Sequence, residues 1–510
     1  MKLILGIELG STRIKAVLCD ENGKVLASGS HEWENSFVGG HWSYPLEKVK
    51  LGLRASYKEL VRNYGKPLTK LDAIGISAMM HGYLAFDREW QLLAPFRTWR
   101  DTTTAEAANE LTEDFGFNIP QRWSVAHFYQ AVLNEEKHVK KVAHLTTLAG
   151  YVHYLLTGKN VLGIGDASGM FPLKGDKYDS LMLAKFNAKL WSKGIMSDMD
   201  DILPQIMLAG ENAGTLTDEG AKYLDPTGTL KAGTIFCPPE GDMGTGMVAT
   251  NSVVPKTANV SSGTSANLTV ILEKPLKNFY REIDIIATPD GHPAALVHTN
   301  NCTTEINEWV NLFSEVAELC GAKIEKGELF TKLFNKSLES DKTVGGLSGY
   351  NYLAGEPLAN TVSGAPLIMR KPEGDLNLAN FMQMQIYSAI SALSLGMDIL
   401  SSEGVKVDSV NAHGGFYKTE FIGQNATSAV LNAPVTVMQN AGEGGAWGIA
   451  LLARYALNNG VSLQDYLDGI FKHTEKKTVM ADEKEKAKCK AFLENYKRNL
   501  SVEQLASQVN

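Results

Sequence analysis

The chain has 510 residues, of which 44% are hydrophobic and 21% are charged, a balance typical of folded globular proteins. Domain-size statistics favour about two to four globular units for this length. The 49 basic and 57 acidic side chains give a formal net charge of -8, which argues against a chain-wide electrostatic interaction with nucleic acid or an anionic membrane surface. We therefore expect neither nucleic acid nor membrane among its partners.

The cysteines and the first residues indicate the cellular compartment. The five cysteines are scattered, odd in number and free of C-x-x-C spacing, so they suggest neither a disulfide framework nor a zinc knuckle. The start, MKLILGIELG, has an apolar run too short for a signal peptide, and no later window approaches about 18 apolar residues. We expect a cytoplasmic protein without a membrane span.

The chain begins with a strand, a small turn and a second strand. Residues 3–28, LILGIELGSTRIKAVLCDENGKVLAS, show an apolar run, a break at Gly10-Ser11-Thr12 and then alternating apolar and polar residues. A helix is predicted over 45–64 and a further strand over 71–79. A Gly-Ser turn taken alone is most often only a hairpin turn. The order of elements predicts an α/β fold.

The same pattern returns about 250 residues later. TANVSSGTSANLTVILEKPL (257–276) again reads as strand, Gly-Thr-Ser turn and strand, which predicts two lobes of one architecture, 1–252 and 253–510. A helix is predicted over 376–404, with Gly404 as its C-cap. Alternating strands and helices follow, ending in a helix of small residues within EGGAWGIALLARYAL.

Four glycine-rich turns follow strand-like runs and predict a nucleotide site. Glycine lets backbone N–H groups converge on an anion, and nearby hydroxyl groups add donors, which is how turns bind phosphate oxygens. No P-loop, H-E-x-x-H or G-x-S-x-G motif is present, so the main signatures of P-loop enzymes, zincins and serine hydrolases are absent. The turns are Gly10-Ser11-Thr12, PPEGDMGTG (238–246), Ser262-Gly263-Thr264-Ser265 and HGGF (413–416).

Several segments resemble, in the right order, the FGGY carbohydrate kinases of the actin/hexokinase-like superfamily, over nearly the whole chain. GIELGSTRIKAVLCDENGKVL is similar to the family's first phosphate motif, and GISAMMHGYLAFDREWQLLAPFRTWRD to its sugar-binding stretch. GDMGTGMVA resembles the segment with the catalytic aspartate, and VSSGTSANL the second phosphate motif. NAHGGFYKTEF and GEGGAWGIALLA resemble the adenosine region.

The resemblance implies an α/β protein with two actin-like, ribonuclease-H-like lobes and a central cleft for nucleotide and sugar. It implies ATP-dependent phosphorylation of a sugar hydroxyl, with ATP and Mg²⁺ bound. Met80-His81-Gly82 resembles the xylulokinase branch, which points to a ketopentose. L-Ribulose and other ketoses or polyols are alternative substrates, and the oligomeric state is open, with a homodimer as one alternative.

Two acidic residues are the predicted centre of the chemistry. A sugar hydroxyl that attacks a γ-phosphoryl group needs a carboxylate to accept its proton and a metal to neutralise the phosphates. Asp242 coincides with the family's catalytic aspartate and is the predicted base, although an aspartate in such a turn often only closes it. Glu8, where the family usually has aspartate, is the predicted Mg²⁺ ligand together with Asp242.

The remaining predicted site residues divide between sugar and nucleotide. Gly10, Ser11, Thr12, Lys15, Gly263 and Thr264 are predicted to contact phosphates, and Gly414 and Gly415 to leave room for adenosine. The predicted sugar contacts are Met80, His81, Gly82, Trp99, Arg100 and Asp101, with Trp123 and His127 as further candidates. Arg100 replaces the asparagine expected in xylulokinases, so it could also face an acid group.

Two alternatives stay open at this point. Fold alone does not fix function, so the same architecture could serve a regulatory, actin-like ATPase. A sugar sensor without turnover is the second alternative, and it rests on Glu8 in place of aspartate.

Overall fold

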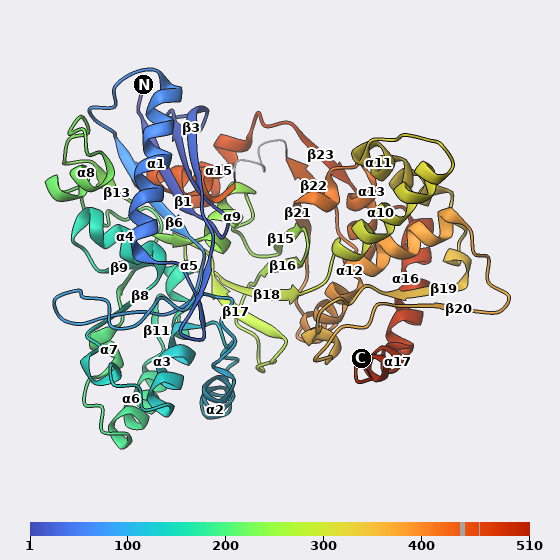
Figure 1. Cartoon of the computed structure of the whole chain (residues 1–510), viewed down its shortest axis with the longest axis horizontal. Coiled ribbons are helices and arrows are strands. Elements are labelled where there is room, and N and C mark those ends of the chain that lie inside the picture. Colours follow the sequence, from blue (N-terminus) through green and yellow to red (C-terminus); the bar gives the residue numbers. More distant parts are fainter. Residues whose placement is uncertain (439–443, 458–459, 510) are drawn as a thin grey trace. The chain divides into compact units, whose positions relative to one another are not determined.

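The computed structural model describes residues 1–438, 444–457 and 460–509, which divide into two units (Figure 1). Unit 1 comprises Met1–Val253, Phe279–Ala294 and Glu443–His473, and unit 2 comprises Val254–Asn278, Ala295–Gly442 and Thr474–Asn510. The first change of unit lies next to the expected boundary, but two later segments return to unit 1. The division therefore differs from the two continuous lobes, 1–252 and 253–510, that the sequence suggested.

The elements of unit 1 include both very short and long segments. Its helices are α1 (Leu46–Tyr64), α2 (Ala105–Phe115), α3 (Ser124–Leu133), α4 (Leu148–Thr157), α5 (Ile164–Ala167), α6 (Ser180–Ser192), α7 (Met199–Ile202), α8 (Asp218–Leu224), α9 (Asp242–Ala249), α14 (Gly444–Ala456) and α15 (Leu463–Phe471). Its strands are β1 (Ile4–Leu9), β2 (Arg13–Cys19), β3 (Val25–Glu32), β4 (Ser36–Val38), β5 (His41–Ser43), β6 (Ala73–Ala78), β7 (Leu84–Phe86), β8 (His144–Thr146), β9 (Val161–Gly163), β10 (Leu173–Lys174), β11 (Lys177–Tyr178), β12 (Gln205–Met207), β13 (Ile235–Phe236), β14 (Glu240–Gly241) and β17 (Ile283–Ala287).

The main sheet of unit 1 has the order β13–β6–β1–β2–β3, and β14 also pairs with β6. Strand β1 runs antiparallel to β2 and parallel to β6, and its apolar residues are buried, as is usual for a central strand covered by helices. Helix α1 packs against β2 and β3, and α14 packs against β1 and β6. The predicted hairpin, helix and strand at the start of the chain are confirmed.

Unit 2 repeats this connectivity. Its sheet runs β18–β16–β15–β21–β22–β23, in which β15 is antiparallel to β16 and parallel to β21. These are the same relations that β1 has to β2 and β6, so the second predicted hairpin is also confirmed. The strands are β15 (Thr257–Ser262), β16 (Ala266–Ile271), β18 (Pro293–Thr299), β19 (Leu347–Tyr350), β20 (Leu367–Arg370), β21 (Ser409–His413), β22 (Val435–Met438) and β23 (Lys476–Val479).

The helices of unit 2 include the longest one described. Helix α12 (Leu378–Ser402) is mostly buried, and Gly404 follows it in the left-handed region at φ 80°, which agrees with the predicted helix end. Every described helix is too short or too polar to pass through a lipid bilayer. The other helices are α10 (Thr304–Leu319), α11 (Lys326–Lys336), α13 (Ile422–Leu431), α16 (Glu483–Arg498) and α17 (Leu500–Ala506).

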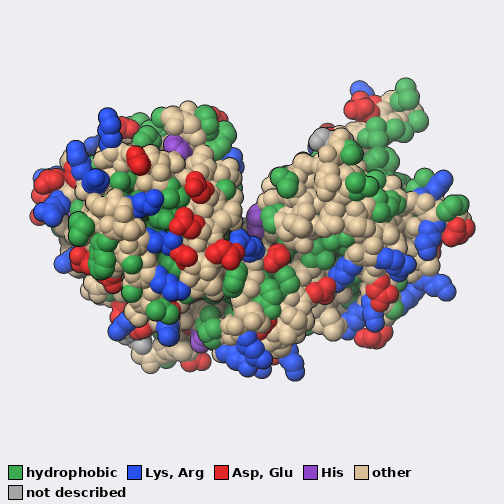
Figure 2. Space-filling view, turned by 90° about the horizontal axis from the view of Figure 1, so that it is seen from below, with side chains coloured by type: hydrophobic (Ala, Val, Ile, Leu, Met, Phe, Trp, Pro, Cys, Tyr) green, Lys and Arg blue, Asp and Glu red, His purple; other side chains and the backbone are tan. Residues whose placement is uncertain are grey.

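Charged side chains of both signs are interspersed on the face shown in Figure 2. This mixture matches the modest net negative charge of the chain.

Candidate active site

Three aromatic side chains hold the first glycine-rich turn, which joins β1 to β2. The indole N–H of Trp33 donates to the carbonyl oxygen of Gly10 at 2.7 Å, and the hydroxyl of Tyr44 donates to that of Ser11 at 2.5 Å. The indole N–H of Trp99 donates to Ser11 Oγ at 3.3 Å. A predicted sugar residue, Trp99, therefore lies beside a predicted phosphate residue, Ser11.

Glu8 lies near the end of β1, opposite Lys15 in the β1–β2 register, and Thr12 is exposed on the turn between them. Glu8 Oε2 accepts a hydrogen bond from the backbone N–H of Ala446 at 3.2 Å, at the start of α14. A Cβ atom on Gly445 would lie 2.5 Å from Glu8 Oε1, so a larger residue there would displace the Glu8 carboxylate. Burial, followed by the nearby Asp242 carboxylate, raises the pKa of Glu8 to about 7.

Asp242 is the first residue of α9 and follows β14 directly. In the β14–β6 register Gly241 pairs with Ala78, which places Asp242 beside the residues that follow β6. Accordingly, Asp242 Oδ1 accepts a hydrogen bond from the backbone N–H of Met80 at 3.2 Å. Burial raises the pKa of Asp242 to about 6, although that hydrogen bond opposes the change. A carboxylate with this pKa is ionised at neutral pH and is a stronger base than an ordinary aspartate.

The Met80-His81-Gly82 segment forms a strained turn after β6. His81 has φ 71° and Gly82 has φ 91°, and a Cβ on Gly82 would lie 2.6 Å from the carbonyl oxygen of Arg97. His81 is buried, and its Nδ1 lies 3.2 Å from the carbonyl oxygen of Gly169. Burial lowers the pKa of His81 well below its usual value, so the ring is neutral. With Nδ1–H donating to the carbonyl, Nε2 is an acceptor.

Two buried side chains near His81 carry polar atoms that have no hydrogen-bond partner among the described residues. These are Nε1 of Trp123 and both ring nitrogens of His127, and both residues are 0% exposed. The rings of Trp123 and His81 stack with centroids 6.4 Å apart. An unpaired buried polar group costs about 1–3 kcal/mol, so such groups are uncommon unless a ligand or water pairs with them. A polyhydroxylated ligand has the chemistry to satisfy them.

Asp101 is almost completely buried and already has several partners. Its Oδ1 accepts hydrogen bonds from the backbone N–H and the hydroxyl of Thr103, at 2.9 and 2.6 Å, and its Oδ2 lies 2.5 Å from His41 Nδ1. Although burial opposes them, these hydrogen bonds keep the pKa of Asp101 below its usual value. The adjacent Arg100 is exposed, with its guanidinium 5.0 Å from the Trp99 ring centroid.

In unit 2 the predicted phosphate turn is anchored to the residues that precede α10. The backbone N–H and the hydroxyl of Thr303 donate to the carbonyl oxygen of Gly263 at 3.0 and 2.7 Å, and Cys302 N donates to that of Thr264 at 2.9 Å. A Cβ on Gly263 would meet no atom within 4 Å. The turn is thus fixed from behind, while Gly263 remains open on its other side.

The two predicted adenosine glycines differ in their surroundings. Gly414 has φ 110°, and a Cβ there would lie 2.2 Å from the carbonyl oxygen of Ser262, so the adjacent backbone requires this glycine. A Cβ atom added to Gly415 would meet no atom of the described residues within 4 Å. The segment GEGGAWGIALLA was also predicted to lie in the adenosine region, but its first two residues, Gly442 and Glu443, lie outside the described residues. The rest of it lies in α14, which belongs to unit 1 and hydrogen-bonds to Glu8.

A pair of buried carboxylates that was not predicted from the sequence lies next to this site. Asp166 Oδ2 accepts a hydrogen bond from the hydroxyl of Thr147 at 2.5 Å, while its Oδ1 has no partner. The Glu240 carboxylate accepts hydrogen bonds from the backbone N–H groups of Gly165 and Asp166 at 3.3 and 2.9 Å. Burial raises the pKa of Asp166 to about 7 and that of Glu240 to about 8. In the sequence, the signal for these two buried acids is that each stands among small residues, in GIGDASG and PPEGD.

Comparison with known proteins decides the family. Residues 3–234 match the N-terminal domain of the FGGY family of carbohydrate kinases, and residues 258–457 match its C-terminal domain. The chain belongs to the FGGY family of carbohydrate kinases. As a member of this family it is a phosphotransferase that transfers phosphate from ATP to a sugar hydroxyl, and its α/β fold is that of the actin-like sugar kinases.

Individual relatives of this carbohydrate kinase are distant. The chain is 24% identical to a xylulose kinase from Haemophilus influenzae over 496 residues, covering 93% of this chain and 94% of the relative. It resembles the structures of a xylulose kinase and a gluconate kinase from Lactobacillus acidophilus, with TM-scores of 0.80 and 0.82 and 18% identity in each case, over 100% of both chains. These likenesses establish the fold of the kinase.

Proposed function

We propose that this carbohydrate kinase phosphorylates a ketopentose, with xylulose as the best candidate, and that Asp242 is its general base. The observation that carries the proposal is the hydrogen bond from the backbone N–H of Met80 to Asp242 Oδ1, which joins the base to the segment that resembles the xylulokinase sugar motif. Xylulose kinases among the relatives that align over most of the chain support the choice of sugar.

The proposed reaction assigns a separate task to each group. Asp242 accepts the proton of the sugar hydroxyl while the hydroxyl oxygen attacks the γ-phosphorus of ATP. The bond between the γ-phosphorus and the ADP leaving group then breaks. Nε2 of His81 accepts a hydrogen bond from a sugar hydroxyl, and Trp123 Nε1 donates one. His127 is neutral, because burial lowers its pKa to about 3, so its ring supplies one donor and one acceptor.

Glu8 and Asp242 fit a magnesium ion shared with the phosphates of ATP. Among the described residues no group of three or more His, Cys, Asp or Glu side chains forms a closed metal site. However, burial and then the Asp242 carboxylate raise the pKa of Glu8, and a divalent cation would relieve the repulsion between the two carboxylates. Mg²⁺ typically binds one or two carboxylates together with substrate phosphates and waters. When bound, the ion would neutralise charge on the phosphates, and Glu8 and Asp242 would be the residues that hold it.

The nucleotide contacts are proposed separately for each unit. In unit 1, Ser11, Thr12 and Lys15 supply donors and positive charge to phosphate oxygens, with Gly10 allowing the turn. In unit 2, Gly263 and Thr264 contact phosphate, and Gly414 and Gly415 contact adenosine. Because ATP is the phosphoryl donor and the cysteines show no disulfide pattern, we place the kinase in the cytoplasm.

A sugar acid is the second candidate substrate, and Arg100 favours it. Its guanidinium is exposed beside Trp99, which hydrogen-bonds to Ser11 of the phosphate turn. Guanidinium groups bind carboxylates in a bidentate manner, and a gluconate kinase has the same fold. If Arg100 binds an acid group, Arg100→Asn removes activity toward gluconate and leaves activity toward ketoses.

A substrate panel with purified protein tests the proposal. ADP release is measured with D-xylulose, D-ribulose, L-ribulose, glycerol and D-gluconate, and the phosphorylated product is identified by mass spectrometry. We expect D-xylulose to give the highest kcat/KM and Arg100→Asn to retain it. ATP turnover that no member of the panel stimulates would contradict the proposal and favour a regulatory ATPase.

A further inference from the structure

Unit 1 contains a cavity of about 650 Å³ that is lined by none of the candidate active-site residues. It lies between the C-terminal half of α1 and the segment that follows α8, residues 224–229. Cavities of about 300–1,000 Å³ are typical of sites for small organic ligands. None of the residues that line it has a role in the proposed phosphoryl transfer.

The inside of this cavity is apolar, with one exception. Val61, Leu68 and Leu224 contribute aliphatic side chains. Tyr57 also lines the cavity and is only 3% exposed, yet its hydroxyl has no hydrogen-bond partner in the structure. A buried hydroxyl without a partner is costly, and a ligand with a polar group on an apolar body would pair with it.

The charged side chains around the cavity are mainly cationic. Arg54, Lys58 and Arg62 follow one another at four-residue intervals on α1, which places them on one face of the helix, and Lys66 comes just after its end. The one carboxylate that lines the cavity, Asp225, already accepts hydrogen bonds from Thr227 N, Thr227 Oγ1 and Leu230 N. Arg62 forms an ion pair with Glu59 at 3.0 Å, and Arg54 Nε donates to the carbonyl oxygen of Tyr223 at 2.8 Å. The positive charge that the cavity offers to a ligand is therefore that of Lys58 and Lys66.

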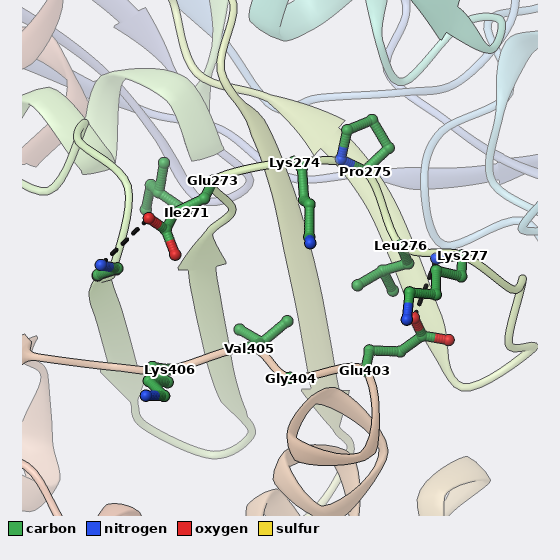
Figure 3. A pocket seen from close by; sticks show the side chains of 11 residues that line it. Ile271, Glu273, Lys274, Pro275, Leu276, Lys277, Glu403, Gly404, Val405 and Lys406 are labelled. Carbon is green, nitrogen blue, oxygen red and sulfur yellow. Dashed lines mark hydrogen bonds and ion pairs between the residues drawn. The ribbon is translucent and has the colours of Figure 1, made fainter.

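A small pocket in unit 2 shows that lysines alone do not make such a site (Figure 3). Its volume is about 30 Å³, and Lys256 there forms an ion pair with Glu273 at 3.1 Å. Glu403 accepts a hydrogen bond from the backbone N–H of Lys277 at 3.0 Å. This pocket is too small for an organic molecule, so it lacks the volume that distinguishes the cavity in unit 1.

We propose that the cavity beside α1 binds an organic anion with an apolar ring body. The aliphatic walls receive the ring, Lys58 and Lys66 face the anionic group, and the Tyr57 hydroxyl hydrogen-bonds to a polar atom of the ligand. The site is separate from the sugar and nucleotide sites. The kinase would then bind a second class of ligand, besides its sugar and nucleotide substrates.

Fluorescence titration of the full chain with anilinonaphthalene sulfonate tests this proposal, because that probe combines aromatic rings with one negative charge. We expect saturable binding that ATP and xylulose do not displace. Lys58→Gln together with Lys66→Gln should weaken the affinity about tenfold, and Tyr57→Phe about threefold to tenfold. Lys48→Gln, on the same helix but outside the cavity, is the matched control and should leave the affinity unchanged.

Two further measurements separate this site from other sites on the protein. Val61→Trp, which fills the cavity, should abolish binding, while circular dichroism checks that each variant stays folded. Phenylnaphthylamine, which lacks the sulfonate, should bind the wild-type protein and the double lysine variant equally. The proposal fails if the folded variants bind the sulfonate probe as tightly as wild type, or if ATP displaces that probe. It also fails if the lysine substitutions weaken the binding of both probes equally.

Discussion

At the scale of single residues, the glutamate at position 8 is integrated into its surroundings. Its carboxylate reaches the backbone N–H of Ala446, and Gly445 leaves room for it. An aspartate would be shorter by one carbon–carbon bond and would lose this contact. This contact supports our proposal that the glutamate belongs to the site rather than weakening it.

We expect Glu8→Asp to lower the turnover of the kinase and to lower the free energy of unfolding by about 0.5–1.5 kcal/mol, the usual value of one hydrogen bond. Steady-state kinetics and denaturant unfolding measure both effects. The exposed Glu494→Asp serves as the control and should change neither. A higher turnover for Glu8→Asp would instead show that glutamate impairs catalysis.

The buried Asp166 gives a prediction about pH. Its pKa is about 7 in the folded protein and near 3.8 when unfolded, so the folded state binds the extra proton between these values. Stability then falls as pH rises from about 4 to 7. Asp166→Asn mimics the protonated form, so we expect it to be more stable than wild type at pH 8, and this advantage to be smaller at pH 5 by roughly 1–3 kcal/mol.

Urea unfolding at the two pH values measures this difference. The exposed Asp176→Asn is the matched control and should show the wild-type pH dependence. If Asp166→Asn destabilised the protein equally at both values, the carboxylate would be ionised and stabilising instead.

At the scale of elements, the two glycines after β21 separate a backbone requirement from a ligand requirement. Gly414→Ala places a Cβ 2.2 Å from the carbonyl oxygen of Ser262 at φ 110°, so we expect loss of stability in unit 2. Gly415→Ala meets open space, so the protein should fold normally while its KM for ATP rises. Thermal unfolding and ATP kinetics distinguish the two, and an unchanged KM would remove Gly415 from the adenosine site.

Elements defined by local pattern could be predicted from the sequence. The hairpins around Gly10 and Gly263, helix α1 and helix α12 each show their own periodicity and end at glycine or small polar turns. The carboxylate pair of Asp166 and Glu240 could not be predicted, because each acid is buried by elements distant in the chain. Likewise, the hydrogen bond of Glu8 spans 438 residues, and no local pattern encodes it.

At the scale of the whole molecule, unit 1 is discontinuous in sequence. Gly6 of β1 packs so closely on α14 that a Cβ would lie 2.0 Å from the carbonyl oxygen of Ala446. Sequence patterns suggested two continuous lobes because the repeated hairpin marks where unit 2 begins, whereas nothing in α14 itself marks its return to unit 1. The predicted boundary at 252/253 thus coincides with one junction but leaves out the later ones.

We expect the isolated fragment 1–253 to be poorly folded, because it lacks α14, which packs against β1 and β6. Limited proteolysis and circular dichroism of the fragment, compared with the full chain, measure this. Co-expression with the missing segment 443–473 should restore protection. A protease-resistant fragment with full secondary structure would show that the returning helices are dispensable.

The most direct test of the proposed chemistry is Asp242→Asn. The variant lacks the carboxylate that accepts the hydrogen bond from Met80 N and serves as the proposed base. The rate of sugar phosphorylation should therefore fall on the order of 10²-fold or more, while the affinity for ATP should change little. Product formation with D-xylulose and equilibrium ATP binding are measured on the same preparation. Near-normal phosphorylation by Asp242→Asn would contradict the assignment of the base.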